Sequence, residues 1–160
     1  EDGNDPLHQE ALATTIELAK YAEDRGCILA TETGPEAPES LLKFLKKVPS
    51  KGVGVNYDPA NLVMCGPFDQ IGGVSVLRDY IVHTHAKDGV HLGAGKHKEL
   101  PLGEGGVVFP YWLAALDKIG YDGFLTIERE VGDNPVADIA KAMAFLRGFD
   151  GKELPSLPWD

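Results

Sequence analysis

Four short, mostly apolar segments of this chain end in side chains that can bind a metal ion. These ends carry Glu32, Asp58, His85 and Glu128, and the third segment carries a second histidine, His83. Strands that each deliver a polar residue at the carboxyl end are typical of an α/β-barrel active site. Three carboxylates and one imidazole are enough ligands for one divalent cation. The pattern therefore predicts a metal centre.

The donor atoms of this set indicate which cation fits and what it would do. An oxygen-rich set suits Mn²⁺, Mg²⁺ or Co²⁺ better than Zn²⁺, whose structural sites prefer sulfur and nitrogen. Such an ion would polarise a substrate carbonyl, and a flanking carboxylate could remove the proton from the adjacent carbon. Each residue alone also has a structural interpretation: Asp58-Pro59, for example, could start a turn.

Strand periodicity indicates where these side chains point. Side chains alternate across a strand, so His83 and His85 share one face, as do Thr126, Glu128 and Glu130. On a barrel strand that face looks into the barrel. We therefore expect His85 near the rim and His83 one layer deeper.

The elements that position these residues follow from hydrophobic periodicity and from glycine and proline punctuation. Residues 61–67 are expected to be an irregular loop, and the glycine-rich residues 88–108 a long loop over the strand ends. Helices are expected at 6–25, 38–47, 68–78, 109–119 and 135–147, and strands at 27–32, 52–57, 80–85 and 123–128.

The alternation of helices and strands predicts an α/β fold with a parallel sheet and outer helices. A complete eight-stranded barrel needs about 250 residues, and this chain has 160. The chain is therefore either an independent α/β domain or part of a barrel. Residues 1–150 are expected to form the domain and residues 151–160 a tail.

Composition narrows the classes of partner. The net charge of −10 disfavours nucleic acid, which needs a basic face. No apolar stretch is long enough to cross a bilayer, and the polar N-terminus is not expected to be a secretory signal. Two cysteines make no disulfide framework or zinc motif, so a cytoplasmic setting is expected.

Several short strings of residues occur together in this chain. Each string alone is a weak indication of a family, but their combination is specific. With them, residues 6–148 resemble the C-terminal half of the xylose isomerase-like TIM barrel superfamily, most closely its sugar phosphate isomerase/epimerase branch. The strings are Glu32-Thr33, residues 56–62 (NYDPANL), residues 83–88 (HTHAKD), residues 102–105 (LGEG) and residues 120–128 (GYDGFLTIE).

This resemblance implies four βα units, the C-terminal half of a (β/α)8 barrel, and a metal-dependent isomerase or epimerase. Its substrate would be a sugar, a sugar phosphate or a related polyol ketone, changed by proton transfer beside the carbonyl. The implied metal ligands are Glu32, Asp58, His85 and Glu128, with the two glutamates also exchanging the proton. Residues implied to lie around the substrate are His83, Lys87, Asn61 and Glu104.

The chain departs from the family pattern in two ways. Asn61 stands where the ketose epimerases and DNA-repair members often have histidine, which argues against a multi-zinc site. The first four strands of the barrel are absent, so activity of this fragment is expected to be lost or impaired. Its open sheet edges would be covered in a homodimer or by a complementing N-terminal half-barrel.

Two other functions stay open at this point. One is a metal-dependent phosphodiesterase of the AP endonuclease kind on the same fold, against which the charge of −10 and Asn61 argue. The other is a non-catalytic half-barrel module that binds a ligand or a partner subunit, an interpretation that truncation favours.

Overall fold

The structure is a computed structural model that describes residues 5–157 and residue 159. Residues 1–4, part of the segment expected not to be a signal, lie outside the described residues. The elements are α1 (Pro6–Glu23), β1 (Leu29–Glu32), α2 (Pro38–Leu45), β2 (Val53–Tyr57), α3 (Pro59–Cys65), α4 (Gly72–Leu77), β3 (Ile81–Ala86), β4 (Asp88–Gly93), β5 (Lys96–Leu100), α5 (Phe109–Lys118), β6 (Leu125–Ile127) and α6 (Pro135–Arg147).

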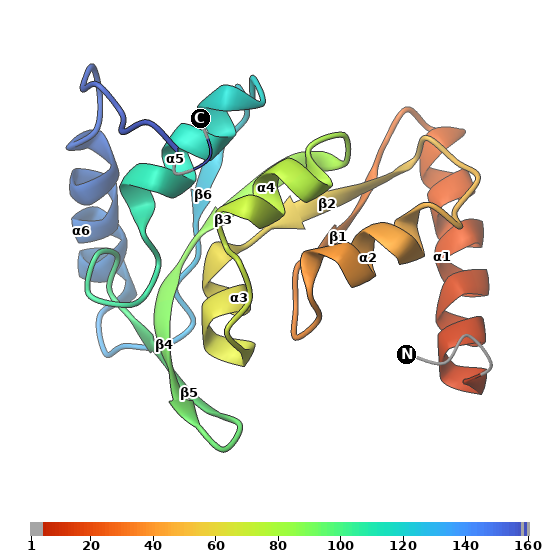
Figure 1. The fold of residues 1–160 in the computed structure, drawn as a ribbon, viewed down its shortest axis with the longest axis horizontal. Coiled ribbons are helices and arrows are strands. Elements are labelled where there is room, and N and C mark those ends of the chain that lie inside the picture. The colour runs from red at the N-terminus through yellow and green to blue at the C-terminus, as the bar shows by residue number, and fades with distance from the viewer. Residues whose placement is uncertain (1–4, 158, 160) are drawn as a thin grey trace.

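A four-stranded parallel sheet organises the molecule in the order β1-β2-β3-β6. The predicted fold, half of a (β/α)8 barrel, is confirmed. In Figure 1 the chain runs from α1 at one end of the molecule to α6 at the other. Because the strands are parallel, their carboxyl ends meet along one edge of the sheet.

Three helices start at prolines that follow a capping side chain. Asp5 accepts the N–H of Leu7, Asp58 accepts those of Ala60 and Asn61, and Asn134 accepts that of Ala137. A side-chain oxygen at this position satisfies helix N–H groups, and proline in the first turn loses nothing because its missing N–H would be unpaired.

The segment after β2 differs from the prediction. Residues 61–67 were expected to be a loop, but α3 runs through most of them, and the helix expected at 68–78 is shortened to α4. The pair Asp58-Pro59 can begin a helix as well as a turn, and here it begins α3. Asp69 caps the chain before α4, where its carboxylate accepts the N–H groups of Ile71 and Gly72.

The prediction of one long loop over residues 88–108 is wrong. Strands β4 and β5 form an antiparallel hairpin that projects from the body of the molecule (Figure 1). Its turn, Gly93-Ala94-Gly95, has positive φ throughout, a conformation that glycine adopts readily. The strands are mostly polar because the hairpin is largely exposed, so they lack the apolar alternation that would have predicted them.

The hydrophobic core lies between the sheet and the helices that cover its outer side. Val55, Tyr57, Leu77 and Trp112 are fully buried there, and Leu157 of the C-terminal tail joins the same cluster. No helix among the described residues is long and apolar enough to cross a membrane.

Candidate metal centre

The four predicted ligands lie together at the carboxyl edge of the sheet. Glu32 ends β1, Asp58 follows β2, His85 lies in β3 and Glu128 follows β6. One ligand atom from each lies within 4.8 Å of the others, and no second group of three or more such residues occurs among the described residues. The order of the strands explains this meeting, because each strand contributes its last residues to one edge.

His85 lies between the two glutamates. Its Nδ1 is 3.2 Å from Oε1 of Glu32 and 3.4 Å from Oε2 of Glu128. The side chain of Glu32 is 38% exposed, that of Glu128 27% and that of His85 17%. The centre is therefore open enough for a small molecule to reach it.

Asp58 carries a buried carboxylate oxygen that a cation could satisfy. Its side chain is fully buried, and while Oδ1 caps α3, Oδ2 has no hydrogen-bond partner. Burial raises the pKa of Asp58 to about 7, the charge of Lys87 opposes that rise, and the charge of Glu32 adds to it. A buried carboxylate oxygen without a donor is costly, and a bound cation would satisfy it.

Thr33 and Asn61 join the first two ligands. The hydroxyl of Thr33 donates to the carbonyl of Asp58 and accepts its N–H, both at 2.8 Å. The amide of Asn61 donates to Oε1 of Glu32 at 3.1 Å and to the carbonyl of Thr33 at 3.0 Å. Asn61, predicted to contact substrate, thus contacts a proposed metal ligand.

His85 has two neighbours on the inner face of the sheet. The Asn56 amide nitrogen lies 3.3 Å from Nδ1 and 3.2 Å from Nε2 of His85. Oδ1 of Asn56 is buried without a partner. The ring of His83 meets that of His85 edge to face, with 5.9 Å between centroids. His83 therefore lies beside the centre, as the strand periodicity indicates.

Lys87 is a buried cation between two carboxylates. It is 4% exposed, and its Nζ lies 2.8 Å from Oε2 of Glu128 and 2.7 Å from Oε2 of Glu130. Burial alone would lower the pKa of Lys87, but the hydrogen bonds to both glutamates outweigh it and hold that pKa above its usual range. The ammonium predicted to meet substrate is thus engaged with protein carboxylates.

Glu104, a predicted site residue, makes no hydrogen bond or ion pair among the described residues that joins it to the four proposed ligands. It is exposed. Its turn is held by Asp88, whose carboxylate accepts the N–H groups of Gly103, Gly105 and Val107.

Sequence reasoning missed several residues that hold the ligands. Asn56 lies two residues from Asp58, so strand alternation could have placed it on the ligand face. Glu130 was placed on the face of Glu128, but its bond to Lys87 was not predicted. The contact of Thr33 with Asp58 could not be predicted in this way, because it depends on how β1 pairs with β2. That Glu32, Asp58, His85 and Glu128 bind a metal ion, and that the neighbouring residues hold them in place for it, stay predictions.

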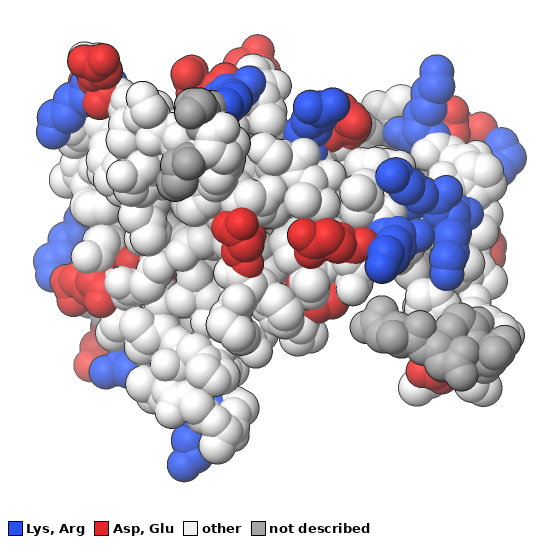
Figure 2. Space-filling model, viewed as in Figure 1, with Lys and Arg blue, Asp and Glu red and all other residues white. Residues whose placement is uncertain are grey.

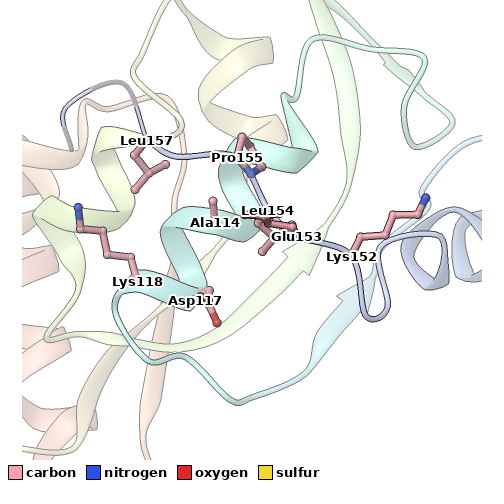
Figure 3. A pocket seen from close by; sticks show the side chains of 8 residues that line it. All are labelled: Ala114, Asp117, Lys118, Lys152, Glu153, Leu154, Pro155 and Leu157. Atoms are coloured by element: carbon pink, nitrogen blue, oxygen red, sulfur yellow. The ribbon is translucent and has the colours of Figure 1, made fainter.

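Two other surface features share no residue with this centre. A hollow of about 590 Å³ lies between α5 and residues 152–157 of the tail, lined by charged side chains of both signs such as Asp117 and Lys152 (Figure 3). Figure 2 shows basic side chains gathered where α1 and α2 lie, whereas the middle of that face is uncharged or acidic.

Comparison with known proteins identifies the family. Residues 7–149 match the xylose isomerase-like TIM barrel family, and the chain belongs to it, which confirms the resemblance seen in the sequence. An uncharacterised protein of Methanocaldococcus jannaschii is 29% identical over 145 residues, covering 86% of this chain and 47% of that protein. An L-ribulose-5-phosphate 3-epimerase of Salmonella paratyphi C is 39% identical over 70 residues, 42% of this chain and 24% of the enzyme.

Solved structures agree with this assignment. A xylose isomerase domain protein from Planctomyces limnophilus matches with a TM-score of 0.83 and 31% identity, over 92% of this chain and 54% of that one. A D-tagatose 3-epimerase-like protein matches with a TM-score of 0.75 and 28% identity, over 89% and 54%. The chain therefore spans about half the length of these relatives.

Proposed function

We propose that this chain is the metal-binding half of a divalent-metal-dependent sugar or sugar-phosphate isomerase or epimerase. The observation that carries the proposal is the convergence of Glu32, Asp58, His85 and Glu128 within 4.8 Å at the ends of four adjacent strands. The epimerase among the curated relatives and the epimerase-like structure support the reaction class. The net charge of −10 and Asn61 argue against a phosphodiesterase on the same fold.

The donor set and the unpartnered Oδ2 of Asp58 fit one divalent ion held by these four residues. Mn²⁺, Mg²⁺ or Co²⁺ suits three carboxylates and one imidazole better than Zn²⁺ does. When bound, such an ion supplies Lewis acidity that makes the hydrogen beside a substrate carbonyl easier to remove.

Glu32 and Glu128 are the residues proposed to carry the proton transfer. They come from the two outer strands of the sheet, and one carboxylate oxygen of each lies near Nδ1 of His85, at 3.2 Å for Glu32 and 3.4 Å for Glu128. A carboxylate has two oxygens, so each glutamate can bind a cation and still exchange a proton. A base on one side of the reacting carbon and an acid on the other suit inversion at that carbon.

The other wall of the substrate pocket is proposed to come from a complementing N-terminal half-barrel, with a second copy of this chain as the alternative. The proposal follows from the unpaired outer edges of β1 and β6 in the sheet of the described residues. Activity of the chain alone is accordingly expected to be impaired.

The test is hydrogen exchange in ²H₂O with Mn²⁺ present, using L-ribulose 5-phosphate and D-tagatose as probes. The readout is ¹H NMR after the paramagnetic Mn²⁺ has been removed by a chelator. We expect slow loss of the signal beside the carbonyl, abolished by Glu128→Gln because the carboxylate that carries the proton is gone. Asp122→Asn, an exposed carboxylate in the turn before β6, is the matched control and should exchange normally.

Either of two results would count against the proposal. Undiminished exchange in Glu128→Gln would remove Glu128 from the reaction. Bound Mn²⁺ without exchange of any probe would favour a non-catalytic half-barrel.

A further inference from the structure

Glu128 is held differently from the other proposed ligands. It lies just beyond the last residue of β6, joined to the sheet by its N–H, which donates to the carbonyl of Ala86 at 3.2 Å. Its carboxylate is fixed by Lys87, whose ammonium also binds Glu130. A buried ammonium with two carboxylate partners has little freedom to move, so it limits the rotation of Glu128.

The same segment is held from its other side by the hairpin. Glu99 of β5 is 8% exposed, and its carboxylate accepts the N–H of Glu130 and, at 2.8 Å, Nη1 of Arg129. Arg129 also donates from Nε to Asp138 of α6 at 3.3 Å. Residues 128–130 are therefore fixed between the end of β3 and the hairpin.

We propose that four residues, Lys87, Glu130, Arg129 and Glu99, form a brace that positions Glu128 for metal binding. Lys87 holds the segment from one side and Glu99 from the other. The brace makes the β4–β5 hairpin part of the metal centre although the hairpin supplies no ligand. This inference rests on the proposed function, because it requires that the four-residue centre bind a cation. Lys87 and Glu99 are positioning residues in this account.

Electrostatics and positioning predict opposite effects when Lys87 is replaced. The ammonium lies 2.8 Å from a ligand oxygen, so its charge repels a bound divalent cation. If charge alone mattered, Lys87→Met would therefore tighten metal binding. If the brace orients Glu128, the same change would weaken binding, since partners that orient ligands are typically worth about 10–100-fold in metal affinity.

The test is isothermal titration of the full 160-residue chain with Mn²⁺, together with the electron paramagnetic resonance spectrum of the bound ion. We expect Lys87→Met to weaken binding about tenfold or more and to alter the spectrum. Lys87→Arg should recover much of the affinity, because a guanidinium can bond both carboxylates. Glu99→Gln should weaken binding about tenfold, the lower end of the range for such partners, and Lys98→Gln, an exposed neighbour on β5, should not change it.

The possible results distinguish a failure of the brace from a failure of the proposed metal-dependent function. Equal or tighter binding in a folded Lys87→Met variant would overturn the brace alone. If that variant does not fold, unchanged affinity in Glu99→Gln would overturn the brace instead. Absence of Mn²⁺ binding by the unaltered chain would overturn the proposed function and the brace with it.

Discussion

Each proposed ligand touches a neighbour that limits its rotation, so the centre is arranged before a cation binds. Preorganised donors avoid the entropy cost of ordering at the moment of binding. Asp58 is fixed by the N–H groups that it caps. The other contacts are Asn61 to Glu32, Asn56 to His85 and Lys87 to Glu128.

Asp88 is the residue on which the turn carrying Glu104 most depends. It is fully buried, and its carboxylate accepts four backbone N–H groups, from Gly89, Gly103, Gly105 and Val107. Asp88→Ala would leave these donors without an acceptor, so we expect the free energy of unfolding to fall by about 3 kcal/mol or more. Urea denaturation measures this change, and a loss under about 1 kcal/mol would contradict the account.

The sequence predicted the four residues that converge at the centre, but not the contacts that hold them in place. A strand end followed by Glu, Asp or His is a local pattern, readable from alternation and composition. The contact of Thr33 with Asp58 depends on the register of β1 against β2, and the contact of Lys87 with Glu130 depends on that of β3 against β6. The register between strands that are distant in the sequence cannot be predicted from any short segment.

Among the elements, the strands of the sheet and four of the helices were predicted from their apolar faces, whereas α3 and the hairpin were missed. The strands of the sheet and helices α1, α2, α5 and α6 begin and end within about two residues of their predicted limits, the usual uncertainty of such boundaries. Helix α3 was missed because its proline and capping Asp58 resemble a turn. The hairpin was missed because it packs little apolar surface.

Helix α1 is anchored by Glu23, which gives a prediction for the pH dependence of stability. Oε2 of Glu23 accepts the Ser50 hydroxyl at 2.6 Å and the Lys51 N–H at 3.1 Å, and the Ser50 bond is the main cause that lowers the pKa of Glu23. The ionised carboxylate of Glu23 therefore stabilises the folded state at pH values above about 4.3, the pKa of a glutamate in the unfolded chain. This stabilisation is lost as the pH falls through the lower pKa that Glu23 has in the folded state.

Glu23→Gln should therefore unfold at a lower urea concentration than the unaltered chain at pH 7, and the difference should narrow as the pH falls from about 5 to about 3. Glu17→Gln, an exposed carboxylate on the same helix, is the control and should show neither effect. A difference that is constant across this range would show that the carboxylate charge of Glu23 does not anchor the helix.

The inner face of the sheet is open. Ile28 is 48% exposed, Val82 40% and Phe124 79%, and the first two gather over Gly54, where a side chain would collide with both. In a closed barrel this face is packed with side chains from all strands. The exposed apolar face and the span of half the length of its relatives both support the proposed complementing half.

This half-barrel alone is proposed to assemble a complete set of metal ligands from four strands. The direct measurement is metal content by elemental analysis, on chain purified without chelators and re-equilibrated with Mn²⁺. We expect about one ion per chain, lost in His85→Ala and retained in His97→Ala, an exposed histidine of the hairpin. No bound ion, or an ion retained in His85→Ala, would contradict the claim.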